Sequence, residues 1–314
     1  MSSQNLSHGN LSSVDEPIEM GTVFNNEDES GIEMIPAVIH EEGWSTPRKL
    51  GFNDAGWEDS PYLTRDGKQL LFLYHPWGDL VVQSRAEELT NILIFEPKKA
   101  LREGLDPRTY YSNYPFDDKH LHPISQNKSY PTYEACPYIS LAGDIFYCGN
   151  LEAYILQKSI PGSIYKNDER LYFNTGGEEG NPHYCEAKDE MWFDCPGDEN
   201  ICVVSDLEKN GWEGNGTLAP YPINFPGEVQ DFQPFLTDDC MTLYFSSNRD
   251  GKNQVYRTNR LKNSWSEPEL FISHPVGIGE FTMTSNGKAM SFVQLFWKED
   301  VETLGIDVWY SEKR

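Results

Sequence analysis

A pattern of acidic, apolar and turn-forming positions recurs along this chain. Its clearest copy runs Asp231-Phe-Gln-Pro-Phe-Leu-Thr-Asp-Asp and leads into the apolar run Leu243-Tyr-Phe. Taking the proline of this phrase as an anchor, the copies stand 76, 45, 52 and 47 residues apart. Repeats of about 40 to 50 residues are typical of β-propeller blades. The anchors are Pro61, Pro137, Pro182, Pro234 and, where the proline is lost, Phe281.

Each copy predicts strands joined by tight turns. We expect each proline at the start of a strand, where a missing N–H does least harm. Asp66-Gly67 and Asn286-Gly287 predict hairpin turns, because such turns need positive φ. A short apolar run follows each turn, and a further strand follows that run. The further strands are expected at residues 92–95, 153–156, 201–204, 254–257 and 307–310.

The start of the chain is predicted to close the ring. Ser264-Trp-Ser-Glu-Pro follows the fourth copy and the similar Trp44-Ser-Thr-Pro precedes the first, but no such phrase follows the last copy. The segment around Val38 to Leu50 is therefore expected to complete the fifth blade, so that no sheet edge stays open. The predicted fold is all-β: a five-bladed β-propeller of four-stranded antiparallel blades over residues 33–314, after a disordered acidic and polar tail over residues 1–32.

The repeated phrase, with its acid-x-x-Pro, Asp-Gly-Lys and Leu-x-Phe, resembles the TolB-type propeller repeat over roughly residues 38 to 314. In that family the repeat is architectural and occurs in periplasmic scaffolds, peptidase gating domains and stand-alone proteins. The blade number is also similar to that of arabinanase and β-xylosidase type glycosidases. Those enzymes carry an Asp directly before a Pro in the first blade. Ser60 at that place argues against a simple transfer of their activity.

Charge limits the expected partners. The 314 residues hold 25 basic against 50 acidic side chains, for a net charge of −25. Such a surface repels phosphate backbones and anionic lipids, so we expect neither nucleic acid nor a membrane as a partner. A small molecule or carbohydrate is the expected ligand, bound by a monomer without a cofactor. Ca²⁺ at the acidic residues is the one metal considered.

The cysteines and the start of the chain suggest an intracellular protein. None of the six cysteines forms a Cys-x-x-Cys pair, which argues against a zinc ribbon, and most are predicted to be small buried apolar residues. No apolar run is long enough to span a membrane, and Met1-Ser-Ser-Gln-Asn lacks the features of a signal peptide. We therefore expect a soluble cytoplasmic protein.

Residues 98–132 are predicted to be an insertion that is rich in aromatic and histidine side chains. A long loop in a compact domain is usually functional or disordered, and the many rings argue against disorder. We predict a folded flap over one mouth of the propeller; the alternative is a loop packed along the outer flank of the first blade. The flap residues proposed to bind substrate are Tyr110, Tyr111, Tyr114 and His120.

Three rows of residues around the anchors are the candidates for chemistry. Residues two apart on a strand share a face. The residues three before, one before and one after each anchor should therefore lie on one face, at one end of the central channel of the propeller. Crowded carboxylates there would suit acid–base chemistry or cation binding. The candidate catalytic residues are Glu58, Glu134, Glu179, His183, Asp231 and Glu280. Tyr62, Tyr138 and Asn181 are proposed to bind substrate.

The acids also have a structural interpretation. An acid repeated in four blades is what a structural role predicts, because its carboxylate can accept backbone N–H bonds from a neighbouring loop. His183 and Glu280 depart from the repeat, and are therefore the more informative positions. The sequence favours a cofactor-independent enzyme, a hydrolase or cyclase acting on a small polar or glycosidic molecule. The alternatives are a non-catalytic scaffold and an interaction module whose acidic rim binds basic partners.

Overall fold

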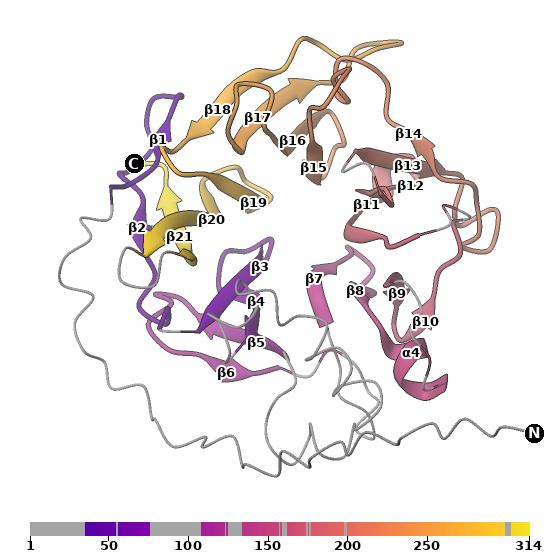
Figure 1. The fold of residues 1–314 in the computed structure, drawn as a ribbon, viewed down its shortest axis with the longest axis horizontal. Helices are drawn as coiled ribbons and strands as arrows, with labels where there is room; N and C mark the ends of the chain where they lie inside the picture. Colours follow the sequence, from indigo (N-terminus) through magenta and orange to yellow (C-terminus); the bar gives the residue numbers. More distant parts are fainter. Residues whose placement is uncertain are drawn as a thin grey trace, which may run out of the picture.

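Five antiparallel sheets surround a central axis and form a five-bladed β-propeller (Figure 1). The computed structural model describes residues 35–54, 56–75, 108–122, 124, 134–156, 158, 162–173, 175, 177–197, 200–298 and 303–314. The predicted tail over residues 1–32 and the expected strand at 92–95 lie outside these residues. In each blade the first strand faces the axis and the later strands lie progressively further out.

The strands follow one another in the blades as the repeat predicts. The first blade contains β3 (Trp57–Leu63), β4 (Gln69–His75), β5 (Arg108–Asn113) and β6 (His120–Leu121). The second contains β7 (Glu134–Ile139), β8 (Ile145–Gly149), β9 (Ser163–Lys166) and β10 (Glu169–Arg170). The third contains β11 (Gly180–Cys185), β12 (Glu190–Asp194), β13 (Ile201–Ser205) and β14 (Thr217–Leu218).

The last two blades each include a strand from the start of the chain. The fourth contains β15 (Asp231–Leu236), β16 (Thr242–Ser247), β17 (Gln254–Asn259) and β18 (Glu269–Ser273), with β1 (Val38–Ile39) on its outer edge. The fifth contains β19 (Ile278–Met283), β20 (Ala289–Lys298), β21 (Thr303–Glu312) and, outermost, β2 (Arg48–Lys49). Beside the strands stand the helix α4 (Leu151–Leu156) and the 3-10 helix η1 (Glu186–Lys188).

The hydrophobic core lies between neighbouring blades. Phe72 of the first blade packs in one cluster with Val308 of the fifth, and Trp192 of the third packs with Phe245 of the fourth. Apolar residues on both faces of a strand are what stacked sheets require. The short apolar runs after each turn therefore form the second strands that these clusters bury.

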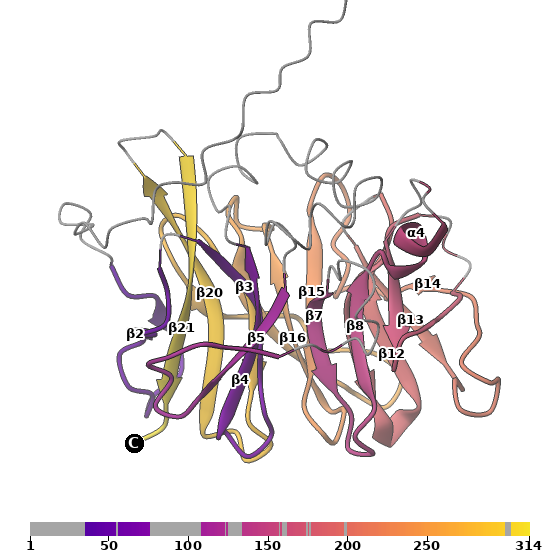
Figure 2. The same cartoon turned by 90° about the horizontal axis from the view of Figure 1, so that it is seen from below.

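One face of the propeller carries the turns that join the first and second strands of the blades. We call it the hairpin face; its turns lie at residues 64–68, 140–144, 186–189, 237–241 and 284–288 (Figure 2). Gly67 and Gly287 adopt φ of +71° and +65° in these turns. The hairpin predictions made from Asp66-Gly67 and Asn286-Gly287 are confirmed.

Three local predictions need correction. The prolines lie within the first strands, not at their starts, because each follows a bulge where no ladder bond is lost. Residues 151–156 form α4 and the third strand of the second blade is β9, since a short apolar run does not distinguish helix from strand. Within residues 98–132, the predicted flap, Arg108–Asn113 form β5, the third strand of the first blade, and the ring of Tyr110 packs on Phe72 and Tyr74 of β4. The predicted flap residues 98–107, 123 and 125–132 lie outside the described residues.

The cysteine prediction also changes. Cys185 bonds to Cys240 and Cys195 bonds to Cys202, so four of the six are not free apolar residues. The first bond joins two blades, and the second joins neighbouring strands of the third blade. Spacing along the chain did not reveal these pairs. Cys185 and Cys240 have a sequence separation of 55, although their Cα atoms lie 5.9 Å apart in the fold.

A side-chain amide attaches the N-terminal segment to the last strand. Asn53 Nδ2 donates to the carbonyl oxygens of Leu50 and Val308 at 2.8 and 2.9 Å, and the Val308 N–H donates back to Asn53 Oδ1 at 2.8 Å. The amide thus pairs with the backbone as a further strand would. Arg48 and Lys49 of β2 pair with β21 just before it.

Substitution Asn53→Ala is expected to lower the free energy of unfolding by about 2 kcal/mol, because it leaves the buried Val308 N–H without an acceptor. Urea unfolding of the purified chain measures the effect, with Asn210→Ala, an exposed asparagine, as the control. A loss no larger than that of the control would contradict this role of Asn53.

Candidate functional site

A bulge in every first strand shapes the central channel. The residue before each anchor has positive φ although none is glycine: 51° at Ser60, 53° at Cys136, 45° at Asn181, 56° at Gln233 and 51° at Glu280. The ladder between first and second strands shifts register at each of these places, as an inserted residue requires. The five bulges therefore form a ring of equivalent positions.

This ring lines a small cavity on the propeller axis. The cavity has a volume of about 50 Å³, which is room for a few water molecules. Each blade contributes the bulge residue, the anchor and the residue after it. The bulge also interrupts the alternation of side chains between the two faces of the strand, on which the prediction of three rows on one face was based. Glu58, Glu134, Glu179 and Asp231 are accordingly not among the residues that line the cavity.

Side chains near the channel accept the N–H groups that the bulges leave unpaired. The Ser60 N–H donates to Glu280 Oε2 at 2.6 Å, and the Glu280 N–H donates to Gln233 Oε1 at 3.0 Å. The Gln233 N–H donates in turn to Asp194 Oδ1 at 2.7 Å. A buried N–H without a partner is costly, so these acceptors have a structural function. Gly279 keeps room for them, since a Cβ there would lie 2.6 Å from Gln233 Oε1.

The channel carboxyls have raised pKa values. Burial raises the pKa of Glu280 well above its usual range, and the nearby Asp59 and Cys136 raise it further. Burial likewise raises the pKa of Asp59 to about 6. Asp59 Oδ1 is buried and has no hydrogen-bond partner among the described residues. Both carboxyls therefore hold a proton more strongly than an exposed carboxyl does.

The four acids that precede the anchors bind backbone or neighbouring side chains. Glu134 accepts the N–H of Ile124 at 3.0 Å, and Asp231 accepts the N–H of Phe225 at 2.7 Å. Each donor lies in the connection that leads into the blade. Asp231 also pairs with Arg249 at 2.7 Å. This is the bonding that a structural role predicts.

The remaining two acids of this row are also held in place. Glu58 accepts a bond from Lys119 Nζ at 2.9 Å, yet burial raises the pKa of Glu58 to about 8. Glu179 accepts a bond from the Thr175 hydroxyl, and burial raises the pKa of Glu179 as well. Both carboxyls are buried away from the cavity lining.

Arg65 crosses the channel at the hairpin face. Its Nη2 donates to the Tyr138 hydroxyl at 2.8 Å, its Nε donates to Asp238 at 3.1 Å, and its guanidinium lies over the Tyr138 ring. The Ser285 N–H donates to the Arg65 carbonyl at 3.1 Å. The contacts reach all five blades and involve, in blade order, Tyr62, Ile139, Glu186, Asp238 and Ser285. Arg65 thus covers this end of the channel.

His183 lies among the aromatic residues that line the cavity. Its ring centroid is 4.5 Å from that of Tyr138 and 4.8 Å from that of Phe235. Burial, with Arg65 nearby, lowers the pKa of His183 to about 3. The imidazole is therefore neutral at pH 7 and packs as the aromatic residues of the other blades do.

Three of the residues proposed to bind substrate, Tyr62, Tyr138 and Asn181, line the axial cavity together with His183 and Glu280. Tyr62 and Tyr138 donate their hydroxyls to the carbonyl oxygens of Ile139 and Tyr184. Asn181 donates to Asp194 at 2.6 Å. The other four lie in or beside the outer strands of the first blade: Tyr110, Tyr111, Tyr114 and His120.

Sequence reasoning missed Asp59, Asp194 and Arg65. Asp59 and Asp194 stand outside the three rows, and Arg65 belongs to a turn that was treated only as a hairpin signal. A proline inside a strand was the available sign of a bulge. The described residues contain no group of three or more His, Cys, Asp or Glu that could hold a metal ion. No helix among them is long and apolar enough to cross a membrane.

Comparisons with known proteins agree with this architecture. No protein-family model matches the chain, and no curated protein matches it. TolB from Acinetobacter baumannii is similar at 14% identity and a TM-score of 0.43; the match covers 81% of this chain and 54% of that one. This chain thus spans about half of that TolB.

Two further solved structures are similar over most of their length. A Dyadobacter fermentans protein of unknown function has 8% identity and a TM-score of 0.48, with 87% of this chain and 100% of that chain covered. A structure described as a glycoside hydrolase has 9% identity and a TM-score of 0.45, with 88% and 92% covered. The likeness concerns the fold alone. The fold that the TolB-type and glycosidase-like resemblance implied, a five-bladed propeller, is the one that the five sheets of the structure form.

Substitution Arg65→Ala is expected to lower the free energy of unfolding by about 3 kcal/mol, because it removes a partly buried cation and leaves its acceptors unpaired. Urea unfolding measures the change. The control is Lys68→Ala in the same turn, where the side chain is 78% exposed. Equal stability of the two variants would show that Arg65 does not hold the blades together.

His183 is expected to make the fold acid-sensitive. Its pKa is about 3 in the folded protein and near 6.5 in the unfolded chain, so the unfolded state binds the proton first as the pH falls below 6.5. Stability from this group is complete above pH 6.5, and about 2 kcal/mol is lost by pH 5.

The variant His183→Phe, which copies Phe235 of the fourth blade, should lose less stability between pH 7 and pH 5 than the wild type. Urea unfolding at both pH values measures the difference, and the comparison removes the effect of groups common to both chains. An identical loss in the two proteins would rule out a buried neutral imidazole.

Proposed function

We propose that this protein is a non-catalytic propeller scaffold whose channel groups stabilise the ring, and that ligands bind elsewhere on its surface. The observation that carries the proposal is the small size of the axial cavity. Its cavity of about 50 Å³ is lined by tightly bonded residues, with Arg65 across the hairpin-face end. Pockets for small organic ligands are usually about 300 to 1,000 Å³.

The hydrogen bonds of the candidate catalytic residues support the same conclusion. Glu280 accepts the Ser60 N–H, and Glu134 and Asp231 accept N–H groups of inter-blade connections. His183 packs between the rings of Tyr138 and Phe235 and is uncharged. Each of these groups has a structural partner, whereas a general acid or base needs a site for the substrate beside it.

An enzyme remains the second candidate, because of one observation. Glu280, Asp59 and Cys136 interact near the axis, and burial raises the pKa of both carboxyls. Perturbed carboxyls of this kind occur at acid–base sites. In this alternative a small polar or glycosidic molecule would react beside Glu280 without a cofactor.

The disulfides bear on the location of the protein. Disulfides persist mainly in oxidising compartments. The two bonds therefore favour such a compartment over the cytoplasmic location that the sequence suggested. The absence of nucleic-acid and membrane partners, and the monomeric state, stay predictions from charge and composition.

Glutamate variants test the proposed function. Glu280→Ala should lower the free energy of unfolding by about 2 to 3 kcal/mol, because the buried Ser60 N–H loses its acceptor. Glu280→Gln keeps an acceptor oxygen, and so should retain most of the stability. Urea unfolding of both variants, with a panel of chromogenic glycosides and lactones as substrates, gives the readouts.

The scaffold proposal expects no turnover above that of buffer by any of the three proteins. Turnover by the wild type that Glu280→Gln abolishes while stability is unchanged would overturn it and establish the enzyme. Full stability of Glu280→Ala would also contradict the structural role.

A further inference from the structure

A groove opens on the hairpin face between the third and fourth blades. Its volume is about 640 Å³, within the range of pockets for small organic ligands. One wall comes from η1, β12 and β13, and the other from the β15–β16 turn and the β17–β18 turn. The groove is separate from the axial cavity, with which it shares no lining residue.

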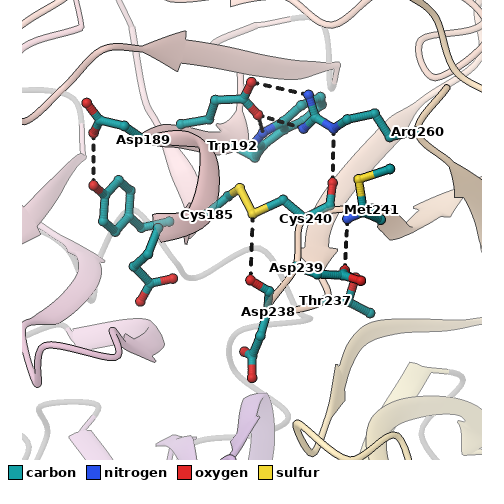
Figure 3. The surroundings of a disulfide bond; sticks show 12 residues. Cys185, Asp189, Trp192, Thr237, Asp238, Asp239, Cys240, Met241 and Arg260 are labelled. Atoms are coloured by element: carbon teal, nitrogen blue, oxygen red, sulfur yellow. Dashed lines mark hydrogen bonds and ion pairs between the residues drawn. A yellow bond between two sulfur atoms is a disulfide. The ribbon is translucent and has the colours of Figure 1, made fainter. Parts of the chain in front are cut away.

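Covalent and ionic bonds fix the two walls of the groove. The Cys185–Cys240 disulfide joins the end of β11 to the β15–β16 turn (Figure 3). Arg260 reaches back across the gap and pairs with both oxygens of Glu190, at 3.2 and 2.6 Å. Its Nε also donates to the Cys240 carbonyl oxygen at 2.9 Å (Figure 3). A site built this way is preorganised, which reduces the entropy lost on binding.

Aromatic and apolar side chains form the floor and sides. The Arg260 guanidinium lies 4.5 Å from the centroid of Trp265, and Trp265 meets Trp192 edge to face. Met241 and Leu261 line the same groove, with 41% and 51% of their surfaces exposed. Exposed apolar side chains beside a bounded hollow are typical of a ligand site.

The charge of the lining is opposite to that of the protein. Lys188 and Lys262 are exposed at the groove, and neither has an ion pair within the part of the chain that the structure describes. The one carboxylate of the lining, Glu190, is engaged by Arg260. Two unneutralised cations therefore stand in a groove of a chain with net charge −25. Such a local field favours an anion.

We propose that this groove binds a small organic acid with an aromatic or alicyclic body. The apolar body would rest against Met241 and Leu261, and the carboxylate or sulfonate group would lie between Lys188 and Lys262. This goes beyond the scaffold function: the groove can bind such a ligand whether or not the axial channel performs chemistry.

Fluorescence titration of the full chain with 8-anilinonaphthalene-1-sulfonate tests the proposal at low ionic strength. This probe carries both an aromatic body and a sulfonate. We expect saturable binding of one equivalent, at least tenfold weaker after the double substitution Lys188→Glu and Lys262→Glu. Addition of salt should weaken binding by the wild type more than by the double variant.

Two controls separate the groove from general effects. Lys288→Glu changes an exposed lysine on the same face, in the fifth blade, and should leave the affinity within twofold of the wild type. N-phenyl-1-naphthylamine has a similar body without the anion and should bind at least tenfold more weakly. Thermal unfolding of each variant confirms that it is folded.

The results that would overturn the proposal are equally definite. Unchanged affinity in the double variant, equal loss in Lys288→Glu, or equal binding of the uncharged probe would each show that the groove does not select organic anions. None of these outcomes depends on turnover in the channel. Failure of this proposal is therefore distinguishable from failure of the scaffold function.

Discussion

The stability of the propeller depends on hydrogen-bond acceptors for certain backbone N–H groups of its innermost strands. At each bulge, an N–H group points away from the neighbouring strand and cannot bond to it. A bulge in each first strand removes one residue from the pairing and leaves its N–H without a partner in the ladder. Glu280, Gln233 and Asp194 supply the missing acceptors for three of these groups. The bonds run from one blade to another, so the same contacts that satisfy the bulges also hold the ring together.

This arrangement explains why the centre of the molecule resembles an active site. Buried acceptors must be polar, and burial raises the pKa of carboxyl groups placed among them. Glu280 and Asp59 therefore acquire the properties of acid–base residues from their surroundings alone. A catalytic carboxyl differs from a structural one in having space for a substrate beside it. Arg65 and the aromatic side chains around His183 leave little such space on the hairpin face.

The repeat allowed the architecture to be predicted from the sequence, because every copy carries a short turn followed by a short apolar run. The anchors and the hairpins at Gly67 and Gly287 were predicted from local chemistry that leaves few alternatives. The third strands were harder: residues 151–156 form a helix, and the rings of β5 looked like a flap although they belong to a sheet. Local patterns do not determine these assignments, since tertiary packing decides them.

The candidate site was less predictable for a definite physical reason. The prediction of three rows assumed that successive side chains alternate strictly between the two faces of the strand. The bulge residues, which are serine, cysteine, asparagine, glutamine and glutamate, adopt left-handed backbone conformations that the residue types alone do not predict. The disulfide that braces the groove was equally hidden, as its partners belong to different blades. The groove depends on residues from five separated segments, which only the folded ring brings together.

Native-state hydrogen exchange at the backbone amides of Ser60, Gln233 and Glu280 tests the central claim most directly. If these N–H groups are locked by side chains across the channel, they will exchange only through global unfolding, with protection that falls with urea as the global stability does. Rapid exchange that is independent of urea, while the amides of β16 stay protected, would show that the channel is open to water and would contradict this account.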